Sequence, residues 1–281
     1  MSATAGIYVH IPFCLTRCGY CDFNAYAGLD GMKPRYLAAL FQEAELAAPG
    51  WAGTDFVSVF LGGGTPTTME PSDLRALLAH LHDRFELTPE AEVTTEANPD
   101  TVTEASLTEL LEAGFARLSI GAQSFDPAVL RSLERIHQPT SVRAAVAAAR
   151  RAGFRNLSLD LIYGANGESL ESWRRTLDET VALGPEHVSA YALTIEPATA
   201  LGRTVAAGEV PGPDPAPGDT PFAREPRPVR GEARAPHADH LPTGEPLLGV
   251  PGDRVRDLRG AGRCARRDHS VGGEASDRLG R

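Results

Sequence analysis

Apolar and polar residues alternate along six short segments of this chain, and longer amphipathic segments rich in Ala and Leu separate them. A period of two is typical of β-strands, because successive side chains point to opposite faces. Strands that alternate with helices indicate repeated βα units and a parallel sheet. The pattern predicts strands at about residues 6–11, 55–61, 91–97, 116–122, 155–162 and 187–194. It predicts helices at about residues 33–48, 71–85, 103–113, 140–152 and 169–183.

Each predicted strand has one apolar face and one polar face. In the fifth, Leu157, Leu159 and Leu161 alternate with Ser158 and Asp160. A flat parallel sheet covered by helices on both sides would need apolar residues on both faces. A curved sheet explains the pattern better, with helices outside and a polar ligand inside. Six strands are too few for a closed eight-stranded barrel, so the sequence predicts an α/β fold, an open (β/α)6 partial barrel with its site at the carboxyl ends of the strands.

Three of the four cysteines lie close together near the amino terminus, as Cys14, Cys18 and Cys21 in C-x3-C-x2-C spacing. A structural zinc site normally uses four protein ligands. A cubane iron–sulfur cluster held by three thiolates keeps one iron open for a small molecule. A disulfide is less favoured, because three clustered cysteines cannot pair evenly and no signal peptide is evident. The spacing therefore predicts a [4Fe–4S] cluster, with zinc and a disulfide as the alternatives.

Polar residues at the predicted strand ends are the other candidates. The Gly-Gly-Gly-Thr turn at residues 62–65 is neither a Walker loop nor G-x-G-x-x-G, so it does not indicate a nucleotide-phosphate site. Glu96 either anchors Arg117 or binds the ammonium or hydroxyl groups of a ligand. His10 and His137 are expected to be hydrogen-bonding scaffold residues. No Ser/His/Asp arrangement and no H-E-x-x-H motif supports a hydrolase.

The composition narrows the functional class. The net charge of −10 argues against general nucleic-acid binding, which needs a basic face. No apolar run approaches the roughly 20 residues that span a bilayer. We therefore expect a cytoplasmic protein, in a compartment that keeps cysteine thiols reduced.

The cysteine motif resembles that of the radical S-adenosylmethionine (SAM) enzymes, which place an aromatic residue before the last cysteine, here Tyr20. Within that family, Tyr-Val-His-Ile-Pro-Phe-Cys at residues 8–14 is similar to the branch of oxygen-independent coproporphyrinogen III oxidases and HemW haem chaperones. Cys-Asp-Phe-Asn at residues 21–24 is similar to HemW. The oxidases carry a further cysteine two places after the third, where this chain has Phe23. The resemblance also implies the partial barrel.

The resemblance implies that SAM chelates the open iron and that an electron from the cluster can break its sulfur–carbon bond. Considered alone, Arg135 would be a solvated surface cation and the glycine turn an ordinary turn. The family pattern instead places them among the SAM contacts, and it identifies no catalytic residue here. The implied cofactor-binding residues are Tyr8, Tyr20, Gly63, Gly64, Thr65, Glu96, Gln123, Arg135 and Asp160.

Three functions follow from this resemblance as hypotheses. The first is a haem chaperone, with haem as cargo and haem-acceptor proteins as partners. The second is an oxidoreductase of porphyrin biosynthesis that acts on coproporphyrinogen III. The third is a truncated fragment that binds a cluster and delivers nothing. A homodimer is a further expectation.

The last quarter of the chain differs from the rest. Residues 1–210, the predicted radical SAM domain, have a net charge of −11, whereas residues 211–281 have +1 and eleven of the 22 prolines. Residues 211–281 contain one aromatic residue and no Ile. Because such a segment cannot bury enough apolar surface to offset its chain entropy, we predict that it is disordered. Out-of-frame translation of a GC-rich gene and a natural disordered extension are the two hypotheses for its origin. Its Cys264 is not expected to bind the cluster.

Overall fold

The computed structural model describes residues 3–211. Residues 212–281, for which disorder is predicted, lie outside the described residues, and so does Cys264. The domain boundary near residue 210 stays a prediction. Six parallel strands form one sheet in the order β1-β4-β5-β6-β7-β8. Their bounds are β1 (Ala3–Ile11), β4 (Thr54–Gly63), β5 (Leu87–Ala97), β6 (Arg117–Gln123), β7 (Asn156–Tyr163) and β8 (His187–Ala192).

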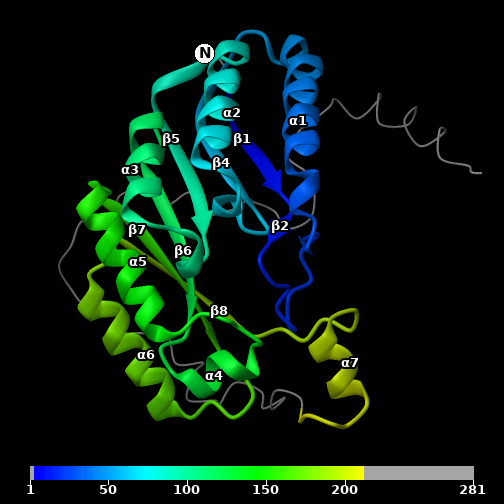
Figure 1. The fold of residues 1–281 in the computed structure, drawn as a ribbon, viewed down its shortest axis with the longest axis vertical. Coiled ribbons are helices and arrows are strands. Elements are labelled where there is room, and N and C mark those ends of the chain that lie inside the picture. Colours follow the sequence, from blue (N-terminus) through cyan, green and yellow to red (C-terminus); the bar gives the residue numbers. More distant parts are fainter. Residues whose placement is uncertain (1–2, 212–281) are drawn as a thin grey trace, which may run out of the picture. The chain divides into compact units, whose positions relative to one another are not determined.

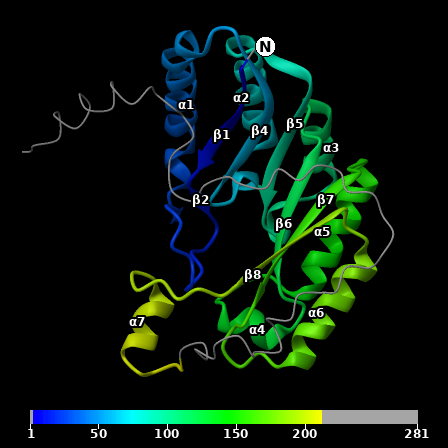
Figure 2. The same ribbon diagram turned by 180° about the vertical axis from the view of Figure 1, so that it is seen from behind.

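Helices connect successive strands, and Figures 1 and 2 show the longer of these helices on one face of the sheet. The α-helices are α1 (Lys33–Ala47), α2 (Pro71–Arg84), α3 (Glu104–Ala113), α4 (Pro127–Ser132), α5 (Pro139–Ala152), α6 (Leu170–Leu183) and α7 (Ala200–Ala206). Short 3-10 helices are η1 (Asp30–Met32), η2 (Ala48–Trp51), η3 (Pro66–Thr68) and η4 (Pro99–Thr101). Gly114 and Gly153 end α3 and α5 at φ 109° and 107°, the left-handed conformation that glycine adopts at least cost.

The outer face of the sheet is apolar and forms the core with the helices. Leu157, Leu159 and Leu161 of β7 are all 0% exposed, as are Leu118 and Ile120 of β6. The residues between them are polar and face the inside of the curved sheet. Helices therefore cover one face only, and the predicted open (β/α)6 half-barrel is confirmed.

Several short elements were not among the predicted strands and helices. The strands β2 (Phe13–Cys14) and β3 (Tyr26–Ala27) pair with each other and are too short to show a period of two. The helix α7 follows the last strand and begins at the N-cap Thr199, whose side chain accepts from the N–H of Gly202. Along residues 3–211, no helix combines the length and the apolar character that crossing a membrane requires.

Candidate functional site

The three cysteines lie on the loop between β1 and α1, which starts at the carboxyl end of β1. The loop folds back on its own start, because the N–H of Tyr26 donates to the carbonyl of Pro12 at 2.7 Å. His10 joins the loop to β1 through a 2.9 Å bond between its Nε2 and the carbonyl of Asn24. All three thiols are free and partly buried, so no disulfide joins them.

Two of the thiols have a polar side chain beside them. The Sγ of Cys14 lies 3.5 Å from the Thr65 hydroxyl, and the Sγ of Cys18 accepts from the Arg135 guanidinium at 3.5 Å. Burial raises the pKa of the Cys14 and Cys21 thiols, and repulsion from the other cysteines raises it further. This mutual repulsion shows that the three thiols lie near one another, and bound iron would favour their thiolate forms.

The donor set fits an iron–sulfur cluster. Among the described residues, no three His, Cys, Asp or Glu side chains are arranged to coordinate a single metal ion. A four-iron cluster makes a different demand, because each of three irons takes its own thiolate. Three soft sulfur donors on one loop meet this demand, whereas a closed zinc site lacks its fourth ligand.

The glycine turn after β4 packs directly against the cysteine loop. Its Gly64 N–H donates to the carbonyl of Ile11 at 2.8 Å, and its Thr65 N–H donates to the carbonyl of Phe13 at 2.7 Å. A Cβ on Gly64 would lie 2.7 Å from the Phe13 carbonyl oxygen, so a larger residue would push the loop away. The turn therefore positions the cysteine loop, and these two amides are already used within the protein.

Two carboxyl groups lie on the inner face of the sheet. Glu96, at the end of β5, accepts the Gly63 N–H at 3.2 Å. Burial raises its pKa to about 7, and repulsion from Asp160 adds to the shift. Asp160 accepts the Ser119 hydroxyl at 2.9 Å, and burial raises its pKa also. A cationic or hydroxyl-bearing ligand beside this pair would restore favourable interactions to both.

Tyr8 and His10 share the inner face of β1. The Tyr8 hydroxyl lies 3.1 Å from Nδ1 of His10. Because Nε2 of His10 faces a carbonyl, Nε2 carries the proton, and Nδ1 accepts from Tyr8. Burial, with smaller repulsion from Glu96, raises the pKa of Tyr8 to about 12, so its hydroxyl stays protonated.

Gln123 ends β6 in the left-handed region, at φ 64°. A non-glycine residue there is uncommon, and such conformations cluster at binding and catalytic sites. The sheet register shifts between Gly121 and Gln123, and this irregularity turns the strand end. A Cβ on Gly121 would lie 2.9 Å from Nε2 of Gln123, so the glycine leaves room for that side chain.

Arg135 and Tyr20 meet at the cysteine loop. Arg135 donates to Cys18, to the carbonyl of Gly121 at 2.8 Å and to His137 at 3.3 Å, and the Tyr20 hydroxyl is a further partner. Burial raises the pKa of Tyr20 well above its ordinary value. Considered alone, Arg135 would be a surface cation, but the fold places its charge beside a predicted cluster ligand.

Two further contacts to the cysteine loop could not be predicted from the sequence. The N–H of Leu201, in α7, donates to the carbonyl of Gly19 at 2.8 Å. The Glu134 carboxylate also lies against Gly19, where a Cβ would come within 2.6 Å of it. Neither contact has a local signal, because each joins segments far apart in the sequence.

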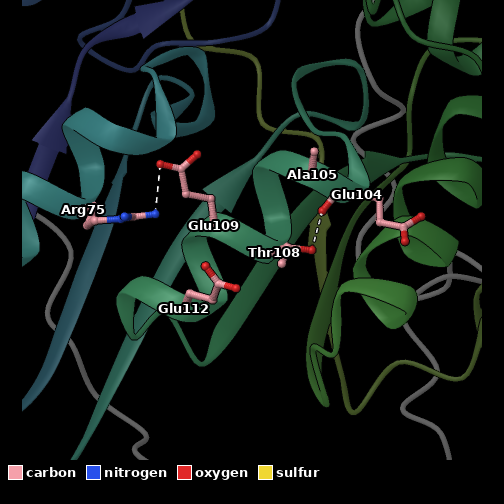
Figure 3. A pocket seen from close by; sticks show the side chains of 6 residues that line it. All are labelled: Arg75, Glu104, Ala105, Thr108, Glu109 and Glu112. Atoms are coloured by element: carbon pink, nitrogen blue, oxygen red, sulfur yellow. Dashed lines mark hydrogen bonds and ion pairs between the residues drawn. The ribbon is translucent and has the colours of Figure 1, made fainter.

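One surface hollow lies away from these residues. It has a volume of about 620 Å³ and lies on the helices α2 and α3, on the side of the sheet opposite the polar face (Figure 3). Arg75 pairs with Glu109 across it at 3.0 Å. Glu104 pairs with Arg151, outside the hollow, at 2.6 Å, and none of the predicted site residues lines the hollow.

The sequence matches the Radical SAM superfamily over residues 8–180. The chain belongs to this superfamily. Among curated relatives, it is 47% identical over 212 residues to the haem chaperone HemW of Mycobacterium tuberculosis, which covers 74% of this chain and 54% of that protein. It is 38% identical over 198 residues to HemW of Escherichia coli, covering 70% of this chain and 52% of that one.

Among solved structures, coproporphyrinogen III oxidase (HemN) from Escherichia coli, a radical SAM enzyme, matches with a TM-score of 0.69 and 32% identity. The match covers 75% of this chain and 49% of that one. This radical SAM chain thus spans about half the length of the relatives it matches. Family membership implies a [4Fe–4S] cluster and SAM as cofactors, and the predicted resemblance is confirmed.

Proposed function

We propose that this radical SAM chain is the cluster-binding and SAM-binding part of a HemW-type haem chaperone. Cys14, Cys18 and Cys21 would hold three irons of a [4Fe–4S] cluster and leave the fourth for SAM. The observation that carries the proposal is three free, partly buried thiols near one another, with Cys14 beside Thr65 and Cys18 beside Arg135. Sequence identity of 47% to a HemW supports the assignment to this branch.

The SAM contacts are proposed from the inner face. Glu96 would receive the ammonium group, whose charge would favour the ionised carboxylate. Asp160, held by Ser119, suits ribose hydroxyls. Gly63, Gly64 and Thr65 would offer carbonyl oxygens, because their amides already donate within the protein.

The other proposed SAM contacts would lie at the same end of the sheet. Tyr8 lies on β1, Gln123 ends β6, and Tyr20 and Arg135 stand at the cysteine loop. When bound, the reduced cluster supplies the electron that can cleave a sulfur–carbon bond of SAM. The protein's part is to bind, orient and exclude water.

Anaerobic reconstitution with iron and sulfide, followed by EPR with and without SAM, tests the cofactor proposal. We expect a reduced cluster signal that changes shape when SAM is added, because SAM would bind the open iron. A signal that SAM leaves unchanged would contradict SAM binding. Absence of any cluster would contradict the whole proposal.

Haem is proposed as the cargo, and haem-acceptor proteins as the partners. Titration of the reconstituted chain with haem should shift the Soret band and retain haem at a fixed stoichiometry. Free haem that passes through a desalting column unretained would contradict cargo binding by this chain. We also propose a cytoplasmic location, and size-exclusion chromatography with light scattering tests the expected homodimer.

Coproporphyrinogen III oxidation is the alternative function. The structural match to HemN favours it, at a TM-score of 0.69. Against it stands Phe23, where the oxidases carry a further cysteine; here the side chain is 60% exposed. Anaerobic turnover with coproporphyrinogen III separates the two, since formation of protoporphyrinogen would establish the oxidase.

The third hypothesis is a fragment that binds a cluster and delivers nothing. It is motivated by the chain's span of about half the relatives' length. Expression of this chain in a strain lacking HemW tests it. Restored haem delivery would exclude the fragment hypothesis, and a stable, cluster-loaded chain without rescue would support it.

A further inference from the structure

Arg135 reaches the cysteine loop because of the way α4 ends. The N–H of Arg135 donates to the carbonyl of Leu130 at 2.9 Å, and the N–H of Glu134 donates to that of Arg131 at 3.0 Å. This pair of bonds is a Schellman motif, with Glu134 in the left-handed position at φ 53°. The motif reverses the chain and directs Arg135 away from the helix axis.

Each nitrogen of the Arg135 side chain has a different protein partner. One terminal nitrogen donates to Sγ of Cys18 at 3.5 Å, and the other donates to the carbonyl of Gly121 at 2.8 Å. The Nε–H points to Nδ1 of His137 at 3.3 Å. A guanidinium has donors only and is planar, so these contacts together define its orientation.

His137 is 1% exposed and is held on both ring nitrogens. Its Nδ1 faces an N–H donor of Arg135, so Nδ1 is the acceptor. Its Nε2 lies 3.0 Å from the carbonyl of Ala122, so Nε2 carries the proton and donates. Only the neutral Nε2–H tautomer satisfies both contacts.

We propose that His137 is a positioning residue that holds the Arg135 guanidinium against the Cys18 sulfur and so raises the reduction potential of the cluster. The proposal rests on the proposed cluster. It assigns a role to a buried histidine that is not among the proposed cluster ligands or SAM contacts.

The physical reason is the charge that a cluster gains on reduction. A cation and a hydrogen-bond donor at a ligand sulfur stabilise the reduced form more than the oxidised form. If the guanidinium turned away from Cys18, this stabilisation would be lost and the potential would fall. Orientation by a residue behind the ligand is the usual way in which proteins tune metal centres.

Two substitutions separate positioning from mere scaffolding. In His137→Asn, the side-chain oxygen stands near the position of Nδ1 and keeps the acceptor for Arg135, while the donor to Ala122 is lost. In His137→Gln, the amide nitrogen reaches toward the position of Nε2 and keeps the donor to Ala122, while the acceptor for Arg135 is lost. Each variant therefore keeps one of the two hydrogen bonds of the wild-type ring and loses the other.

The test is an EPR-monitored redox titration of the full chain, reconstituted anaerobically with iron and sulfide, without SAM. We expect wild-type iron content in both variants and a wild-type potential in His137→Asn. In His137→Gln we expect about a tenfold lower ratio of reduced to oxidised cluster at the wild-type midpoint, a shift of about 59 mV for one electron. Circular dichroism checks that both variants are folded.

The outcomes are distinct. An unchanged potential in His137→Gln, or an equal shift in both variants, would overturn the positioning role while leaving the cluster proposal intact. A wild-type chain that takes up no iron would overturn both proposals.

If the His137 variants do not fold, Arg135→Gln provides an independent measurement. Removing the charge of Arg135 should lower the reduction potential of the cluster by at least the shift expected for His137→Gln. A wild-type potential in a folded, fully loaded Arg135→Gln chain would show that no charged donor acts on the cluster, and the proposal would fail.

Discussion

The backbone N–H of Gly63 donates to the Glu96 carboxylate across 3.2 Å and ties the carboxyl end of β4 to that of β5. This bond favours the charged form of Glu96, yet burial and the nearby Asp160 outweigh it and raise the pKa to about 7. Glu96 therefore exchanges a proton near neutral pH, at the place proposed for the ammonium group of SAM.

Glu96 should make the stability of the chain depend on pH. Because the folded pKa of about 7 lies above the ordinary 4.5, the folded state holds a proton more tightly, and stability falls as pH rises from 4.5 to 7. Glu96→Gln should remove this loss, which corresponds to about 3 kcal/mol above pH 7. Urea unfolding of the cluster-free chain at pH 5 and pH 8 measures it.

Glu92→Gln is the matched control, on the same face of β5 but exposed. In Glu92→Gln, the difference in unfolding free energy between pH 5 and pH 8 should stay close to that of wild type. An equal pH dependence in wild type and Glu96→Gln would contradict the burial argument. Asp160, whose pKa is also raised, contributes the same sign and remains in both proteins.

Cluster binding should depend on each of three thiols. Replacing Cys14, Cys18 or Cys21 by Ala leaves two thiolates for the cluster, so reconstituted chains should lose most of their iron. Cys264→Ala is the control and should keep the wild-type iron content. Colorimetric iron and sulfide assays, with EPR of the reduced protein, measure the outcome; iron retained by all three variants would exclude this site.

Gly64 should be sensitive to a single added methyl group. In Gly64→Ala the new Cβ would lie 2.7 Å from the Phe13 carbonyl oxygen, so the cysteine loop must shift. We expect a loss of about 1–3 kcal/mol in unfolding free energy, and weaker iron retention. In Gly31→Ala the Cβ meets nothing within 4 Å, so stability should stay near that of wild type. Equal behaviour of the two variants would argue against close packing of turn and loop.

The outer core can be tested with matched leucines. Leu118 is 0% exposed, and Leu118→Ala should destabilise the chain by about 3–5 kcal/mol through lost burial and a cavity. Leu46 is 84% exposed, so Leu46→Ala should change stability by less than about 0.5 kcal/mol. Chemical denaturation measures both, and a small effect at Leu118 would contradict the assignment of the apolar face.

Much of the fold could be predicted from local pattern. Leu157, Leu159 and Leu161 alternate with Ser158 and Asp160, and a strand converts that alternation into two faces whatever its neighbours are. The cysteine spacing likewise places three thiols on one short loop. The pair β2 and β3 could not be predicted, because two residues carry no period.

The environment of the candidate site was decided by tertiary structure. The family resemblance predicted that Arg135 and Gly64 belong to the site. It did not predict that Arg135 donates to Cys18, 117 positions earlier, or that Gly64 packs on Phe13. The raised pKa of Glu96 likewise depends first on burial in the folded sheet and then on Asp160, a residue of another strand.

The sequence by itself determined which residues form strands, which face of each is apolar, and which loop carries the thiols, since these depend on neighbours one to four positions away. Only the tertiary structure decided which polar groups meet at the strand ends. Strand order, register and the left-handed residue Gln123 at the end of β6 set those distances, and they arise from packing across the whole sheet.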